Sequence, residues 1–205
     1  ASGQVSHTEG QYTTASGQGS HAEGYSTRVL GSYSHAEGWG TVVTSDYSHA
    51  EGYYATASGQ GSHAQGYGTD AEGMFSFAGG GHSKAEAQGS TALGFNLVSS
   101  KSYGTVLGWF NERDVTDSLF TVGVGTITEK KDAFSIHSGS TGYTVRVGSN
   151  GALGTDTLFY VTGVAGSRGT TTRGTSVFAG DVVISGTLFD SAGNSIGSGG
   201  SISTV

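Results

Sequence analysis

A short motif recurs at every fourteenth position through the first half of this chain. Five histidines mark it, inside units that read SHTEG, SHAEG, SHAEG, SHAEG and SHAQG: His7, His21, His35, His49 and His63. The same frame continues without histidine at residues 76–80 (SFAGG), 90–94 (STALG) and 104–108 (GTVLG). Glycine at one place in a fixed period is typical of a solenoid, in which each repeat forms one coil and glycine turns a corner.

A repeat of this length is too short for a helix, a turn and a strand, but it fits two short strands joined by two tight turns. We therefore expect an all-β fold in which about eight coils stack as parallel strands, about 4.8 Å apart. Because side chains alternate along a strand, Ser, Ala and Gly would share one face and the His and Glu columns the other. A second column of small apolar residues has the spacing expected of a narrow core: Ala15, Val29, Val43, Ala57, Ala71 and Ala85.

The composition excludes several classes of protein. The chain has 38 glycines but neither proline nor cysteine, which excludes disulfides, thiolate metal sites and cysteine nucleophiles. A net charge of −7 has the wrong sign for a non-specific nucleic-acid binder, and no apolar run is long enough for a membrane span. So thin a core buries little apolar area against the backbone entropy, so we expect self-association. The chain begins and ends within Gly/Ser-rich sequence without a signal segment, so we expect it to be a piece of a longer protein.

The Ser-x-Ala-x-Gly motif at this period resembles the head repeat of trimeric autotransporter adhesins of the YadA type, over residues 1–108. The SHAEG form is similar to the version found in bacteriophage tail fibres and tail-tip proteins. The resemblance implies an intertwined homotrimer of left-handed parallel β-rolls. It implies a virion tail component that contacts other tail or fibre proteins and binds a polysaccharide or protein of the host surface. The alternative is the head of a trimeric adhesin on a bacterial cell surface.

The chain departs from the bacterial pattern by placing His and Glu where Val and Ile would stand. Three interpretations are open for these columns: an axial His/Glu network inside the trimer, a solvated face, and, least favoured, a metal site on the histidines. If His and Glu pair inside the trimer, the histidine pKa would be raised. The residues concerned are His7, Glu9, His21, Glu23, His35, Glu37, His49, Glu51, His63 and Gln65.

Two further sets of residues are candidates for surface contacts. Large aromatic rings follow the repeat glycine, and they suit a contact between neighbouring chains better than a row that stacks a ligand: Tyr25, Trp39, Tyr53, Tyr67, Phe95 and Trp109. Basic residues in two loops could meet an acidic polysaccharide, although such charges are more often solvated: Lys130, Lys131, Arg168 and Arg173.

The second half of the chain is predicted to consist of β hairpins. The frame ends at Trp109, and the segment at residues 117–122 (DSLFTV) is echoed at residues 156–161 (DTLFYV). No helical periodicity is present. We expect a β-roll over 1–108, a connector with a first hairpin module over 109–150, a second module over 151–192, and a Gly/Ser-rich linker over 193–205.

No residue pattern marks an enzyme. Glu112, Asp114 and Asp117 could in principle hydrolyse a glycan, but nothing indicates a shaped cleft with two differently tuned acids. A Ser and His arrangement that recurs five times does not single out a nucleophile. The sequence therefore favours a non-enzymatic structural and attachment segment without a cofactor, with a glycan-hydrolysing fibre as the less favoured alternative.

Overall fold

A computed structural model describes residues 1–111, 118–139, 142–147 and 159–161. The chain divides into two units, residues 1–162 and 163–205, and every described residue belongs to the first. The described residues form strands and turns without a helix, which confirms the all-β prediction. No helix among them has the length and hydropathy that a bilayer crossing requires.

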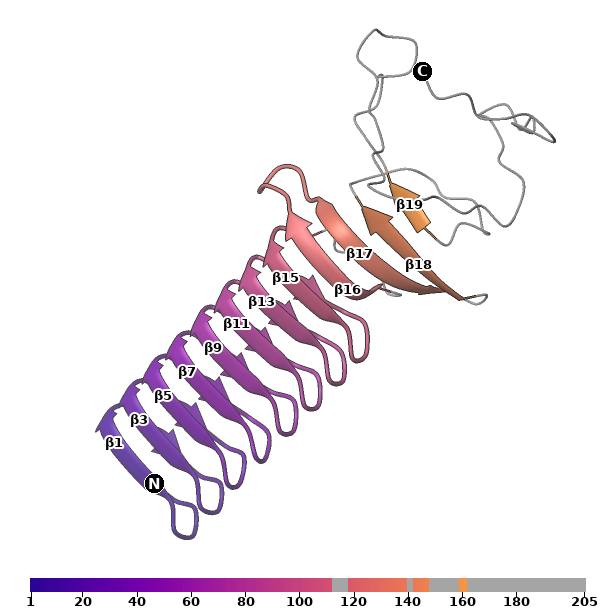
Figure 1. Ribbon diagram of the computed structural model, residues 1–205. Coiled ribbons are helices and arrows are strands. Elements are labelled where there is room, and N and C mark those ends of the chain that lie inside the picture. The colour runs from indigo at the N-terminus through magenta and orange to yellow at the C-terminus, as the bar shows by residue number, and fades with distance from the viewer. Residues whose placement is uncertain (112–117, 140–141, 148–158, 162–205) are drawn as a thin grey trace, which may run out of the picture. The chain divides into compact units, whose positions relative to one another are not determined.

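The part of the chain up to Trp109 forms a solenoid of stacked coils (Figure 1), as the period predicts. Each coil contributes one five-residue strand to a long sheet: β1 (His7–Gln11), β3 (His21–Tyr25), β5 (His35–Trp39), β7 (His49–Tyr53), β9 (His63–Tyr67), β11 (Phe77–Gly81), β13 (Thr91–Phe95) and β15 (Thr105–Trp109). A two-residue strand of each coil joins a short sheet: β2 (Thr14–Ala15), β4 (Arg28–Val29), β6 (Val42–Val43), β8 (Thr56–Ala57), β10 (Asp70–Ala71), β12 (Lys84–Ala85) and β14 (Val98–Ser99).

Neighbouring coils pair in parallel with a constant offset that equals the sequence repeat. His21 pairs with His35, Glu23 with Glu37 and Gly24 with Gly38, so residues of one type form columns along the solenoid. The short strands keep the same offset, as in the pairing of Val29 with Val43. The register therefore places each repeat position directly above its equivalent in the next coil.

The core between the two sheets is one small side chain thick. Alanines of the long sheet and the small column predicted from the sequence are all fully buried in a single cluster: Ala15, Ala22, Val29, Ala36, Val43, Ala50, Ala57, Ala64, Ala71, Ala78, Ala85 and Ala92. From β3 to β9 the histidine that precedes each long-sheet alanine is half-buried. Neighbouring side chains therefore point to opposite faces of the sheet, as expected. Because most of these side chains are alanines, the two sheets approach closely; the few larger residues of the cluster are Val29, Val43, Leu97 and Val106.

The repeat glycine is required at the fourth position of each long strand, just before the corner. Gly52 has φ +112°, and a Cβ built on it would lie 2.3 Å from the carbonyl oxygen of Gly66 in the next coil. Both the left-handed backbone and the close approach of the next coil exclude a side chain there. This contact explains why glycine recurs at the same place in every coil.

The long sheet continues beyond the repeat frame. Strand β16 (Ser118–Val124) pairs in parallel with β15, but its offset exceeds the repeat by one, since Gly108 pairs with Gly123. Strands β17 (Asp132–Gly139) and β18 (Gly142–Val147) then add in antiparallel fashion, and β19 (Phe159–Val161) adds in parallel to β18. Both strands of the duplicated segment thus pair in parallel with the strand before them, which the hairpin prediction did not include.

The short sheet ends at a side chain. Asn111 accepts a hydrogen bond from the Val98 amide at 2.9 Å and donates one to the Val98 carbonyl at 3.0 Å. Its carboxamide thereby makes the two hydrogen bonds that a further strand would make with β14. Asn111 is buried, so this cap is part of the folded core.

Candidate functional site

The predicted His and Glu columns lie on the outer face of the long sheet, opposite the alanine core. We call the residues of β1, β3, β5, β7 and β9 that form them the His/Glu face: His7, Glu9, His21, Glu23, His35, Glu37, His49, Glu51, His63 and Gln65. Their side chains are half-buried in the middle of the face, whereas His7, Glu9 and Gln65 are exposed. Whether this face points to a trimer axis stays a prediction.

The imidazole rings of this face contact one another along the column: His35 stacks on both His21 and His49, whereas His7 meets His21 edge-to-face and His63 is tilted against His49. Ring centroids are 5.0 Å apart for His7 and His21, 4.7 Å for His21 and His35, and 4.8 Å for His49 and His63. These distances match the spacing of neighbouring strands, about 4.8 Å. Phe77 lies edge-to-face against His63, 4.9 Å away, so the histidine column ends on an aromatic ring.

Several Nε2 nitrogens of the histidine column have no hydrogen bond within the described part of the chain. The Nε2 atoms of four of these histidines are buried and have no hydrogen-bond partner among the described residues: His21, His35, His49 and His63. Burial lowers the pKa of His35 and His49, and the neighbouring histidines lower it further, against a smaller opposing effect of the glutamates. In the single chain these pKa values therefore move in the direction opposite to the one expected for His/Glu pairing in a trimer.

The glutamates lie beside the histidines of their own strand. His21 Nε2 is 3.7 Å from Glu23 Oε2, and the equivalent distance from His7 to Glu9 is 3.9 Å. Three groups of His and Glu bring their ligand atoms within 4.8 Å of one another: His7, Glu9 and His21; His21, Glu23 and His35; and Glu37, His49 and Glu51. Imidazole nitrogens and carboxylate oxygens of this face therefore lie close enough together to be potential ligands of the same ion.

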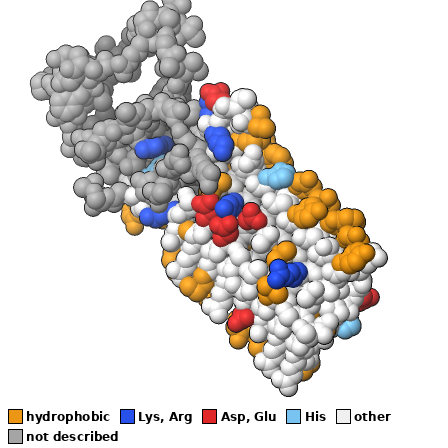
Figure 2. Space-filling view, turned by 180° about the vertical axis from the view of Figure 1, so that it is seen from behind, with side chains coloured by type: hydrophobic (Ala, Val, Ile, Leu, Met, Phe, Trp, Pro, Cys, Tyr) orange, Lys and Arg blue, Asp and Glu red, His pale blue; other side chains and the backbone are white. Residues whose placement is uncertain are grey.

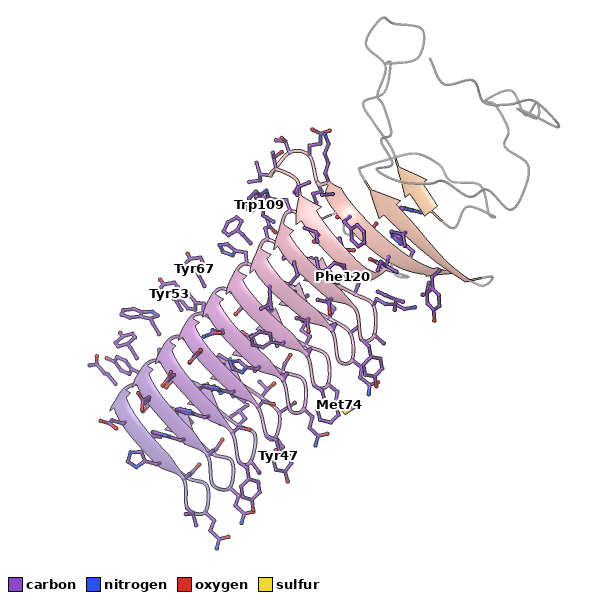
Figure 3. The ribbon with its side chains drawn as sticks, in the orientation of Figure 1. Tyr47, Tyr53, Tyr67, Met74, Trp109 and Phe120 are labelled. Atoms are coloured by element: carbon purple, nitrogen blue, oxygen red, sulfur yellow. The ribbon has the colours of Figure 1, made fainter. Side chains whose placement is uncertain are left out.

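The aromatic residues predicted after the repeat glycine follow one another along one edge of the solenoid, which we call the first corner. Tyr25 stacks on Trp39 at 4.2 Å, and Tyr53 stacks on Tyr67 at 5.1 Å with parallel planes. Figure 2 shows hydrophobic side chains following one another along this edge, and Figure 3 labels Tyr53, Tyr67 and Trp109 on it. Most of these rings are about half exposed, Trp109 by 56%.

His82 closes a gap in this row that the sequence analysis missed. Glycine occupies the aromatic position at Gly81, and the next residue takes its place. The His82 ring lies 4.8 Å from Tyr67 and 5.8 Å from Phe95, both in edge-to-face geometry. The sequence signal that could have revealed His82 was an aromatic residue directly after Gly81, the glycine that interrupts the column of aromatic residues.

A second row of rings occupies the opposite edge of the solenoid, the second corner, and the sequence analysis missed it too. Its members are strongly exposed, and all have a left-handed backbone with φ between +54° and +59°: Tyr33, Tyr47, Phe75 and Tyr103. Tyr47 is labelled on this edge in Figure 3. Glycine fills the same position at Gly19, Gly61 and Gly89. The spacing of Tyr33 and Tyr47, which equals the repeat, was the available signal.

The outer face of the short sheet carries an ion cluster. Lys84 Nζ lies 2.9 Å from Glu72 Oε1 and 3.5 Å from Glu86 Oε1. The hydrogen bond to Glu72 raises the pKa of Lys84, and burial raises the pKa of the neighbouring Asp70. This arrangement stabilises the stacking of charged residues on adjacent coils.

Of the two basic loops predicted from the sequence, the structure describes only the one with Lys130 and Lys131. Lys130 is exposed in the loop between β16 and β17, whereas Lys131 pairs with Glu129, its Nζ 2.7 Å from Oε1. Arg168 and Arg173 lie outside the described residues, as do Glu112, Asp114 and Asp117. A groove of about 460 Å³ lies beside this loop and is lined by Phe95, Trp109, Phe110, Gly125, Thr126 and Ile127.

Comparison with known proteins identifies the repeat. The family model of the YadA head domain repeat matches residues 50–69, 57–83 and 71–96, the coils from β7 to β13. No curated protein matches the chain. Residues 50–96 therefore match the YadA head domain repeat, and this match supports an adhesin-type function.

Proposed function

We propose that the chain is a non-enzymatic attachment segment that works as a homotrimer. The observation that carries this proposal is the pair of exposed aromatic rows at the two corners. Contiguous exposed apolar patches on a folded chain mark contacts with other proteins or with ligands. The core contains only alanine- to valine-sized side chains in most coils, so the large apolar surface lies outside it.

Backbone strain at the second corner supports an association role. A non-glycine residue in the left-handed region costs roughly 1–2 kcal/mol. Glycine is accepted at this position in three coils, yet Tyr33, Tyr47, Phe75 and Tyr103 occupy it in others. Exposed rings on a strained backbone stabilise the single chain little. We therefore infer that they contact another molecule.

The repeated character of the polar faces supports a structural role. The His/Glu face presents nearly the same groups at each of five successive strands, whereas a catalytic site requires one distinct constellation in a shaped cleft. Because the backbone groups of neighbouring strands are paired along the whole stack, the solenoid would act as a stiff spacer. Attachment would then use the exposed rings or loop residues such as Lys130.

For the biological setting, we propose a bacteriophage tail fibre or tail-tip protein located in the virion. Other tail proteins and a host-surface polysaccharide or protein would be its partners. The SHAEG form of the repeat supports this setting. The head of a trimeric surface adhesin on a bacterial cell is a second candidate, because the match to the YadA head repeat fits it equally well. Tail genes on both sides of the coding gene would support the phage and exclude the cell-surface adhesin.

Light scattering after gel filtration tests the trimer. We expect three times the 20.7 kDa of one chain, and a stable folded monomer would contradict the proposal. The double variant Phe75→Gly/Tyr103→Gly removes two rings of the second corner. Glycine is the natural residue at the equivalent positions 61 and 89, so the backbone should accept it. We expect this variant to keep its β circular dichroism and to dissociate at concentrations where the parent chain remains trimeric.

Attachment itself is tested by binding the labelled chain to candidate host cells. The parent chain should bind in a saturable manner, and Trp109→Ala or Lys130→Ala should weaken binding if those surfaces make the contact. Hydrolysis of the host polysaccharide by the purified chain, lost on Glu112→Ala or Asp114→Ala, would instead support the glycan-hydrolysing fibre.

A further inference from the structure

Two sets of potential metal ligands on the His/Glu face share no residue. The first comprises His21, Glu23 and His35, and the second comprises Glu37, His49 and Glu51. Each set draws on two adjacent coils, β3 with β5 and β5 with β7. The third group, His7 with Glu9 and His21, uses a histidine of the first set, so it competes with that set for an ion.

The donor atoms define the class of ion. Imidazole nitrogen together with carboxylate oxygen suits zinc and the neighbouring divalent transition metals, whereas calcium and magnesium prefer oxygen alone. Metal to ligand bonds of about 2.0–2.2 Å place the donor atoms around one ion roughly 3–4 Å apart. The donor atoms within each set lie within 4.8 Å of one another, which is close to the separation that a shared ion requires.

Two independent features of the face point to a cation. The Nε2 atoms of His21, His35 and His49 are buried without a hydrogen-bond partner among the described residues, although imidazole nitrogens in protein interiors are ordinarily satisfied. In addition, Glu23 pairs with Glu37 and Glu37 with Glu51 in register, so like charges face one another on neighbouring strands. An ion between the coils would satisfy the nitrogens and offset the carboxylate charges together.

We propose that the His/Glu face binds divalent transition-metal ions such as Zn²⁺, one at each of the two sets. Each ion joins adjacent coils of the same chain, so it acts as a cross-coil link in the solenoid. All ligands come from one chain, and the proposal therefore stands independently of the trimer. A chain carries about two such ions when both sets are filled.

The fifth strand of the face offers a built-in control. Gln65 occupies the glutamate position there, and Glu51 pairs with it in register. His63 stacks in the same histidine column but belongs to none of the three ligand groups. His63→Gln should therefore leave metal binding unchanged, even though it removes a histidine from the same face.

The register also predicts a gain of binding. Glu37→Gln removes one ligand of the second set with a side chain of the same shape, and Gln at this position is already accepted at residue 65. Adding Gln65→Glu to that variant creates the equivalent group one coil further along, from Glu51, His63 and the new carboxylate. The double variant should regain the ion that the single variant loses.

The experiment uses the full chain stripped of metal by a chelator, loaded with Zn²⁺ and dialysed before elemental analysis. We expect about two ions per chain for the parent and His63→Gln, about one for Glu37→Gln, and about two again for Glu37→Gln/Gln65→Glu. Loading with Co²⁺ gives a second readout, since its visible absorption reports nitrogen and oxygen ligands. Circular dichroism of each variant verifies the fold.

Several outcomes would overturn the proposal. One is less than one ion per chain in the parent, and another is zinc content that does not respond to Glu37→Gln. A third is a double variant that binds no more than the single variant. Loss of binding in His63→Gln would show that the ions follow the histidine column in general and not the two sets.

Discussion

His49 stacks on His35 with ring centroids 5.0 Å apart and planes within 4° of parallel. The two residues come from neighbouring coils and pair directly in the long sheet. Protonation of both would therefore bring two positive rings into contact in a half-buried column. Burial lowers the pKa of both rings; the charges of His49 and His21 lower that of His35 further, and the charge of His63 lowers that of His49, so the neutral state is favoured.

We expect the metal-free chain to lose stability on acidification because of this stack. The pKa values of His35 and His49 are lowered in the folded state, so the unfolded chain binds protons first as the pH falls below about 6.5. The stabilisation is complete above that pH and is lost as the pH drops through the lowered values. Thermal unfolding with a chelator present should give a melting temperature that decreases from pH 7.5 to pH 5.

His35→Gln/His49→Gln provides the comparison for the pH experiment. This variant should show a smaller decrease over the same pH range. A parent chain whose melting temperature rises on acidification would mean that the histidines are protonated in the fold, as expected for pairing with glutamate in a trimer.

Gly52→Ala should disrupt the stacking of the coils. A Cβ at this position meets the backbone of Gly66 at 2.3 Å, and neither backbone can move without breaking the register. Steric overlap and an unfavourable φ together should lower the free energy of unfolding by more than about 3 kcal/mol. Urea unfolding followed by circular dichroism measures the change.

Gly68→Asn is the matched control for Gly52→Ala. Gly68 also has positive φ, but a Cβ there meets only the ring of His82, and Asn96 holds the equivalent position two coils on. We expect a change near 1 kcal/mol or less, since asparagine tolerates the left-handed region. Equal effects of the two substitutions would contradict the role assigned to the coil-to-coil contact.

Asn111→Ala should destabilise the end of the short sheet. It removes the acceptor of the Val98 amide and the donor to the Val98 carbonyl in one step. Unpaired backbone groups in a partly buried position cost roughly 1–3 kcal/mol. Hydrogen exchange should show faster exchange of the Val98 amide, whereas Ser102→Ala, at an exposed corner, should leave that amide protected.

Lys84→Gln should lower stability at neutral pH by about 1 kcal/mol or less, because partly exposed ion pairs contribute little. It leaves Asp70, Glu72 and Glu86 without the ammonium group that lies among them. The difference from the parent chain should shrink in high salt, which screens the remaining repulsion. Lys101→Gln serves as the control, and a loss that is insensitive to salt would indicate a packing effect instead.

The repeat made most of the solenoid predictable. Its constant spacing was sufficient for the parallel coils, and the alternation predicted that Ala22 and Ala36 lie on the face opposite the His and Glu columns, because both depend on local periodicity. The predicted columns of His and Glu do form one face. Their stacking distances, the unpaired nitrogens and the lowered pKa values depend on three-dimensional contacts and were not accessible from the sequence.

The region after Trp109 was harder to predict. Strand β16 continues the long sheet with an offset one position longer than the repeat, and a search restricted to the repeat frame misses it. Aligning Thr121, Val122 and Gly123 with Val106, Leu107 and Gly108 would have found this strand. The cap by Asn111 was missed because a single side chain that replaces a strand leaves no periodic signal.

The constant register makes the length of the solenoid a discrete quantity. An in-frame duplication or loss of one repeat adds or removes one coil, about 4.8 Å of the stack, while every junction between coils stays equivalent. A shift by a single position within a strand would instead turn Ala50 outward and His49 inward, exchanging the two faces of the sheet. Variation in reach between related chains should therefore proceed in whole coils.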